Sequence, residues 1–100
     1  MSEETWGFAP PPFKAEEALQ RLRRDLRELG LTERSGVFEQ RGLALARAEV
    51  ADGHIAAAVV RKPSRNSPEW QTRTLKSSAE VRDFTQHLKR QLAQWSDRDD

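Results

Sequence analysis

The sequence predicts an α+β fold in which a helix, a three- or four-stranded antiparallel meander and a second helix follow one another. Residues 15–29 and 77–95 carry apolar side chains at helical spacing, whereas residues 35–76 break into short apolar stretches separated by turn signals. Both amphipathic helices need an apolar surface, and one sheet face offers it. We therefore expect both helices on one sheet face. The other face is then open, or is covered by the N-terminal segment or by a second subunit.

The chain has 100 residues, a length that suits a single domain. We expect an extended arm over residues 1–13, one folded domain over 14–95 and a frayed, charged tail over 96–100. Three consecutive prolines exclude helix from the arm and favour polyproline II. The aromatic residues of the arm have two interpretations: they fold back onto the core, or they form a docking peptide for another protein. These residues are Trp6, Phe8 and Phe13.

The first helix shows the clearest periodicity in the chain. Glu16 and Glu17 lie in its first turn, where the helix dipole favours negative charge. Gly30 supplies a left-handed residue that ends it. Its apolar positions, three or four residues apart, are Ala15, Ala18, Leu19, Leu22, Leu26 and Leu29.

A hairpin is expected at Asp52-Gly53, because a type I′ turn requires positive φ at both central positions. Residues 43–50 also have high helix propensity, but the strand that begins at Ile55 needs a partner, which favours a strand. Pairing across the turn opposes Val50 with Ile55, Ala48 with Ala57 and Ala46 with Val59, all on one face. The other, partly hydrated face is expected to carry Leu45, Arg47, Glu49, Ala56, Ala58 and Val60.

A polar loop with two prolines over residues 61–68 leads into a last strand over residues 69–75. Ser77 and Glu80 form the Ser-x-x-Glu pattern of a capping box, which opens the second helix. Its apolar face consists of Val81, Phe84, Leu88, Leu92 and Trp95.

Composition excludes several kinds of site. With no cysteine, the chain has no disulfide, thiolate nucleophile or cysteine-ligated metal. The two histidines, His54 and His87, lack neighbouring carboxylates at ligand spacing, and the five scattered glycines form no phosphate-binding loop. We therefore expect no metal, no cofactor, no catalytic constellation and no enzymatic activity.

No apolar run is long enough to span a membrane, and the N-terminus is acidic, so we expect a cytoplasmic protein without a membrane partner. Thirteen arginines against four lysines, with twelve alanines, indicate a GC-rich bacterial source.

One local charge excess stands out against a net charge of +1: five basic residues and one acidic residue lie within residues 61–76. Arginine and lysine there could neutralise phosphates, and an exposed tryptophan could stack on an unpaired base. Alternatively, the tryptophan points into the core and the loop is simply solvated. The candidate nucleic-acid residues are Arg61, Lys62, Arg65, Trp70, Arg73 and Lys76.

The expected order of elements resembles that of double-stranded-RNA-binding domains. Those domains carry a lysine-rich motif at the start of the second helix, and residues 77–82 contain no lysine, so no family is assigned.

Taken together, the sequence favours a small non-enzymatic module that binds a protein partner or its own copy. Self-association is expected to bury Leu45 and Val60 across a two-fold axis, and the arm residues Trp6, Phe8 and Phe13 are further candidate contacts. Nucleic-acid binding through residues 61–76 is the alternative.

Overall fold

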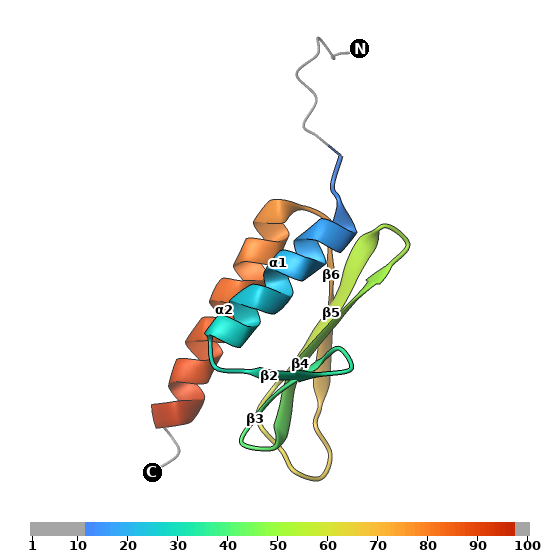
Figure 1. Cartoon of the computed structure of the whole chain (residues 1–100). Coiled ribbons are helices and arrows are strands. Elements are labelled where there is room, and N and C mark those ends of the chain that lie inside the picture. Colours follow the sequence, from blue (N-terminus) through green and yellow to red (C-terminus); the bar gives the residue numbers. More distant parts are fainter. Residues whose placement is uncertain (1–11, 98–100) are drawn as a thin grey trace.

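Two helices and one antiparallel sheet make up the protein, as a computed structural model that describes residues 12–97 shows (Figure 1). The sheet has five strands in chain order, rather than the three or four expected, and the α+β class is confirmed. The elements are α1 (Ala15–Glu28), β2 (Thr32–Arg34), β3 (Val37–Gln40), β4 (Leu43–Ala51), β5 (His54–Val60), β6 (Trp70–Leu75) and α2 (Ser78–Asp97).

Three two-residue turns connect the first four strands. In each turn a residue with positive φ precedes a glycine with positive φ: 53° and 82° at Ser35-Gly36, 56° and 79° at Arg41-Gly42, and 55° and 77° at Asp52-Gly53. This pair of conformations defines the type I′ turn, whose twist matches that of the strands it joins. The Ser35-Gly36 turn creates β2, the strand that the sequence analysis missed.

The register across Asp52-Gly53 is the expected one. Val50 pairs with Ile55, Ala48 with Ala57 and Ala46 with Val59, and residues 43–51 form a strand rather than a helix. Because side chains alternate along a strand, these six lie on one face of the sheet.

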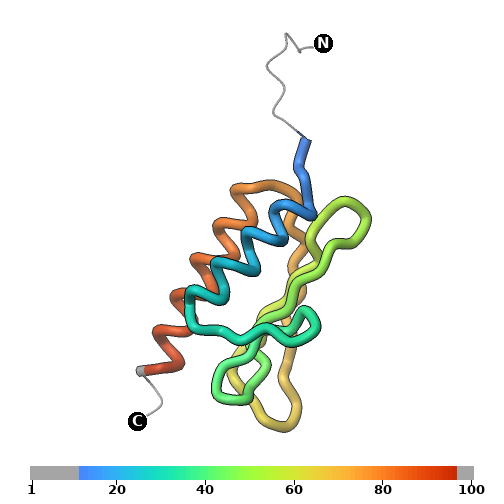
Figure 2. Tube along the Cα trace, in the orientation of Figure 1, coloured from blue at the N-terminus to red at the C-terminus, as the bar shows by residue number. Residues whose placement is uncertain are grey.

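Both helices lie on that same face, and the trace of the described residues leaves the opposite face without a helix (Figure 2). α1 contacts β4, β5 and β2, while α2 contacts β6 and packs along α1. The layer between helices and sheet is the hydrophobic core, and its most completely buried large side chains are Phe38, Phe84, Leu22, Leu26, Ile55 and Leu88. Phe13 also packs against this core, whereas Trp6 and Phe8 lie outside the described residues.

A β-bulge in β4 corrects the expected position of Leu45. Phe38 pairs with Ala46 and Glu39 with Ala44, so Leu45 is the extra residue between them. A bulge sets two successive side chains against one partner and thereby breaks the alternation. Leu45 and Ala46 consequently both join the core, with exposed fractions of 2% and 0%. Leu45 is thus a core residue and not part of the open face.

Both helix ends that the sequence marks are closed as expected. Gly30 has φ of 96°, and the N–H groups of Gly30 and Leu31 donate to the carbonyls of Arg27 and Leu26. These two bonds form a Schellman motif. At the start of α2, the Glu80 N–H donates to Ser77 Oγ at 3.2 Å, and Glu80 Oε1 accepts the Lys76 N–H at 2.7 Å. Ser77 therefore caps α2 as predicted, whereas Glu80 accepts from Lys76, the residue before the cap, and not from the Ser77 N–H of a complete capping box.

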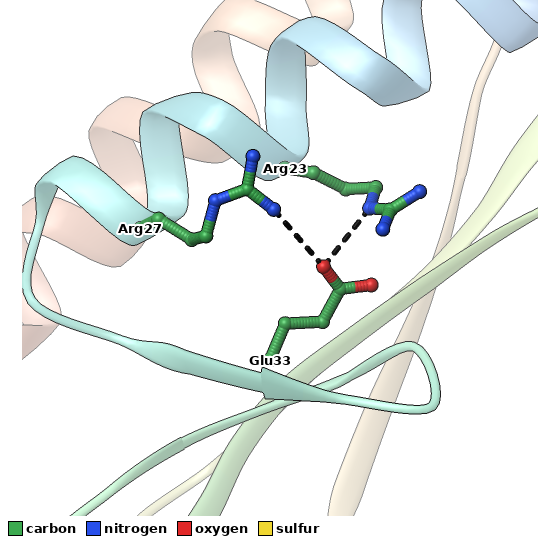
Figure 3. A network of polar contacts seen from close by, with 3 residues as sticks. All are labelled: Arg23, Arg27 and Glu33. Atoms are coloured by element: carbon green, nitrogen blue, oxygen red, sulfur yellow. Dashed lines mark hydrogen bonds and ion pairs between the residues drawn. The ribbon is translucent and has the colours of Figure 1, made fainter.

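A three-residue ion-pair cluster joins α1 to the edge strand β2 (Figure 3). One oxygen of Glu33 accepts from Arg23 Nε at 2.9 Å and from Arg27 Nη1 at 3.2 Å. Glu33 pairs with Phe38 in the sheet and so points to the helix side, where only 14% of its side chain is exposed. The two arginines stabilise a carboxylate that would otherwise be desolvated without a partner.

No helix within residues 12–97 is long and apolar enough to cross a membrane.

Replacing Gly30 with alanine should lower the free energy of unfolding by about 1 kcal/mol, because a side chain disfavours the left-handed conformation. The added Cβ would meet its nearest neighbour, Gln40 Nε2, at an ordinary 3.7 Å, so the backbone conformation alone should cause the loss. Urea denaturation measures the change. Gly30→Asn should recover part of the stability, and an alanine variant as stable as the parent would contradict this assignment.

Replacing Glu33 with alanine should destabilise the fold by about 1 kcal/mol, since two charge-assisted hydrogen bonds to a mostly buried carboxylate are lost. Arg27→Ala should cost less, because Arg27 is 51% exposed and bonds at the longer distance. Arg24→Ala, an exposed arginine on the same helix, is the matched control. Equal denaturation midpoints for Glu33→Ala and Arg24→Ala would show that the cluster contributes nothing.

Candidate functional site

The sheet face opposite the helices, called the outer face below, is covered by no helix or strand of residues 12–97. Strand pairing arranges its side chains in rows across the sheet, and two adjacent rows occupy the middle. The first row is Arg34, Val37, Arg47, Ala58 and Thr72, and the second is Glu49, Ala56 and Thr74.

An arginine–tryptophan contact crosses the outer face at one end. The guanidinium carbon of Arg47 lies 4.6 Å from the centre of the Trp70 ring, within the range of a cation–π interaction. Arg47 belongs to β4 and Trp70 to β6, so the two side chains meet above β5. Their contact explains why Ala58 and Val60, which face this side by register, are only 1% and 2% exposed.

A shallow hollow of about 480 Å³ occupies the middle of the outer face. Its lining includes the small residues Gly36 and Ala56, together with Thr72 and Thr74 on one side and Val37 on the other. Small side chains at the centre of the sheet allow another surface to approach the backbone closely.

The charges on the outer face are of both signs. Arg47 and Glu49 are exposed, lie two residues apart in β4 and border the hollow. Within residues 12–97, Glu49 forms no ion pair, so its carboxylate is available to a partner. The Cα atoms of this cation and this anion are about 7 Å apart along the strand.

The basic residues predicted to bind nucleic acid do not share one surface. Arg61, Lys62 and Arg65 are exposed in the loop between β5 and β6, where Arg61 lies 3.7 Å from Glu69. Trp70 lies on the outer face, with Arg47 on its ring. Arg73 alternates with Trp70 and Thr72, and so points to the helix side of the sheet.

Lys76 follows the end of β6, where its N–H binds Glu80. The residues predicted to bind nucleic acid are thus divided among the loop between β5 and β6, the outer face and the helix side of the sheet.

The proposed interaction residues are likewise divided. Leu45 is in the core, and Val60 is buried beside Trp70, its partner in β6. Neither offers surface to a partner, whereas Val37, Ala56 and the two threonines of β6 do. The sequence could not reveal the contact of Arg47 with Trp70, because it depends on the register between β5 and β6 across a long loop.

His87 lies in α2, on the helix side of the sheet, where the charges of Arg73 and Arg90 act on it. Burial and the positive charges of Arg73 and Arg90 lower the pKa of its imidazole below the ordinary value. Within the described residues, no group of three or more histidine, aspartate or glutamate side chains could hold a metal ion.

Comparisons of the chain with models of known protein families, with curated proteins and with solved structures found no match.

His87 should destabilise the fold at acidic pH. Because its pKa is lower in the folded than in the unfolded chain, the unfolded state binds more protons, and the free energy of unfolding should fall as pH drops from about 7.5 through the depressed pKa. His87→Gln should show a smaller loss over this range.

An NMR titration of the imidazole checks the cause directly. Arg73→Gln and Arg90→Gln should each raise the pKa of His87, and Arg82→Gln should leave it unchanged. A pKa of His87 at or above the ordinary value of about 6.5 in the parent protein would contradict the assignment.

Proposed function

We propose that the protein is a non-enzymatic interaction module that pairs with a second copy of itself through the outer face. The observation that carries this proposal is the order of charge along β4, where exposed Arg47 and Glu49 point the same way and flank Ala48. Such a surface is complementary to itself.

A two-fold axis can bring the opposite charges of two copies together. An isologous interface brings the same patch of each copy together, so residue i meets residue j and j meets i. An axis that lies between two facing sheets and crosses β4 at Ala48 places Arg47 of each copy over Glu49 of the other. The same axis places Thr72 over Thr74, and it brings Ala56 to the part of the second copy's outer face where Arg47 and Trp70 cover Ala58.

The mixed character of the outer face favours a reversible dimer over a permanent one. Obligate interfaces resemble a hydrophobic core, whereas non-obligate interfaces are about as polar as the rest of a protein surface. The outer face combines threonines, alanines and a valine with opposite charges. We therefore expect the monomer to be folded by itself, since its core is complete on the helix side.

Nucleic-acid binding stays the alternative, supported by the exposed cations Arg61, Lys62 and Arg65. It has weaker support than the dimer, because Arg47 occupies a face of the Trp70 ring that a base would need for stacking. Changing the three loop cations to glutamate should abolish salt-dependent binding if this alternative holds, and should leave the dimer intact if the outer face carries the function.

A charge exchange in β4 tests the proposed dimer. Arg47→Glu alone, or Glu49→Arg alone, puts like charges opposite each other twice per dimer and should weaken dimerisation by roughly tenfold or more. The double variant Arg47→Glu/Glu49→Arg restores opposite pairs and should recover most of the affinity. Sedimentation equilibrium measures the dissociation constants.

Arg82→Glu on α2 is the matched control for a reversed charge outside the outer face. Because Arg47→Glu also removes the contact with Trp70, circular dichroism must first show that each variant is folded. A parent protein that stays monomeric at millimolar concentration, or single variants that dimerise as well as the parent, would rule out the proposed interface.

A further inference from the structure

Strand β6 forms an edge of the sheet that no other element of the described chain covers. It pairs with β5 alone, and four successive residues, Gln71 to Thr74, are exposed. An edge strand presents a row of unpaired backbone N–H and C=O groups and so acts as a template for a further strand. The backbone of β6 is therefore able to accept an extended peptide.

The surroundings of this edge are cationic on the helix side. Arg73 points to that side, and its charge, like that of Arg90 in α2, acts on His87. Neither arginine forms an ion pair with another described residue. The carboxylates at the two ends of the strand, Glu69 and Glu80, bind Arg61 and the Lys76 backbone N–H.

On the outer-face side, the central residues of β6 are uncharged, and the Arg47 guanidinium lies over Trp70 at the start of the strand. Thr72 and Thr74 point to the outer face and carry a methyl and a hydroxyl group each. β-branched neighbours across two strands pack well on a pleated surface. The two sides of the edge thus differ: cationic toward α2, and uncharged in the middle of the strand toward the outer face.

We propose that β6 binds an acidic, extended segment of a partner protein, which joins the sheet as an additional strand. Backbone hydrogen bonds to the β6 edge supply affinity, and alternate side chains supply specificity. Every second residue of the segment is a glutamate or aspartate that faces Arg73 and Arg90. The residues between them are β-branched and lie beside Thr72 and Thr74.

A second copy of this chain fits the edge less well than an acidic segment does. Antiparallel pairing of β6 with its own copy brings two Arg73 side chains onto the same side of the sheet near the centre of the paired strands, where like charges repel. An acidic strand brings carboxylates to the same place. The proposal does not depend on the outer-face dimer, because the segment is held by the backbone edge of β6 and by the cations on the helix side, whereas the dimer joins two sheet faces.

The test uses the full chain and a synthetic peptide of alternating glutamate and valine, as long as β6 and labelled with fluorescein. Fluorescence anisotropy gives its dissociation constant, and amide NMR locates it. We expect shifts concentrated in the amides of Trp70 to Leu75. The double variant Arg73→Glu/Arg90→Glu should weaken binding by roughly tenfold or more, and Arg82→Glu should leave binding unchanged.

Two peptide controls separate charge from backbone pairing. A peptide with glutamine in place of glutamate should bind much more weakly if the cations select the partner. A peptide with N-methylated backbone nitrogens keeps the charges but loses its hydrogen-bond donors, and should not bind.

The proposal is overturned if the glutamine peptide binds as well as the glutamate peptide, if the shifts fall outside β6, or if no binding occurs at millimolar peptide. β6 amide shifts that appear on concentrating the Arg47→Glu variant without peptide, where the outer-face dimer is weakened, would identify a second copy as the occupant of the edge, and would also overturn the proposal. Sedimentation of the same samples reports the outer-face dimer separately, so that failure of either interaction is recognised by itself.

Discussion

Both helices cover the same face of the five-stranded sheet, and the other features of this protein depend on that arrangement. Burial of Phe38, Ile55, Leu22 and Phe84 between sheet and helices is the main source of stability. The bulge in β4 adds Leu45 to the same layer. With the core complete on one side, the opposite face is stabilised by smaller means: short side chains in β5 and the Arg47–Trp70 contact above them.

The division of the sheet into a covered and an uncovered side gives two distinct surfaces. The outer face has opposite charges close together on one strand, and this suits a copy of itself. The β6 edge has cations on the helix side and threonines on the other, and this suits an acidic strand. Both surfaces lie on regular elements that the core holds in place, so each can bind without folding first.

Local sequence signals predicted most of the fold, whereas features that depend on tertiary contacts were missed. Asp52-Gly53 fixed a register, and Gly30 and Ser77 marked helix ends, because turns and caps depend on neighbouring residues. Ser35-Gly36 carries the same kind of hairpin signal but precedes strands too short for an alternating pattern. Leu45 was misplaced because a bulge breaks alternation without a mark in the sequence, and the Glu33 cluster depends on where α1 lies above β2.

Isotope-filtered NOE spectroscopy on a mixture of labelled and unlabelled protein tests most directly whether the outer face joins two copies. Intermolecular contacts are expected between the methyl groups of Thr72 in one copy and Thr74 in the other. Their detection would place the two rows of the outer face against each other, as the two-fold arrangement about Ala48 requires. Intermolecular contacts confined to the helices, or none from the outer face in a sample that sediments as a dimer, would contradict the account.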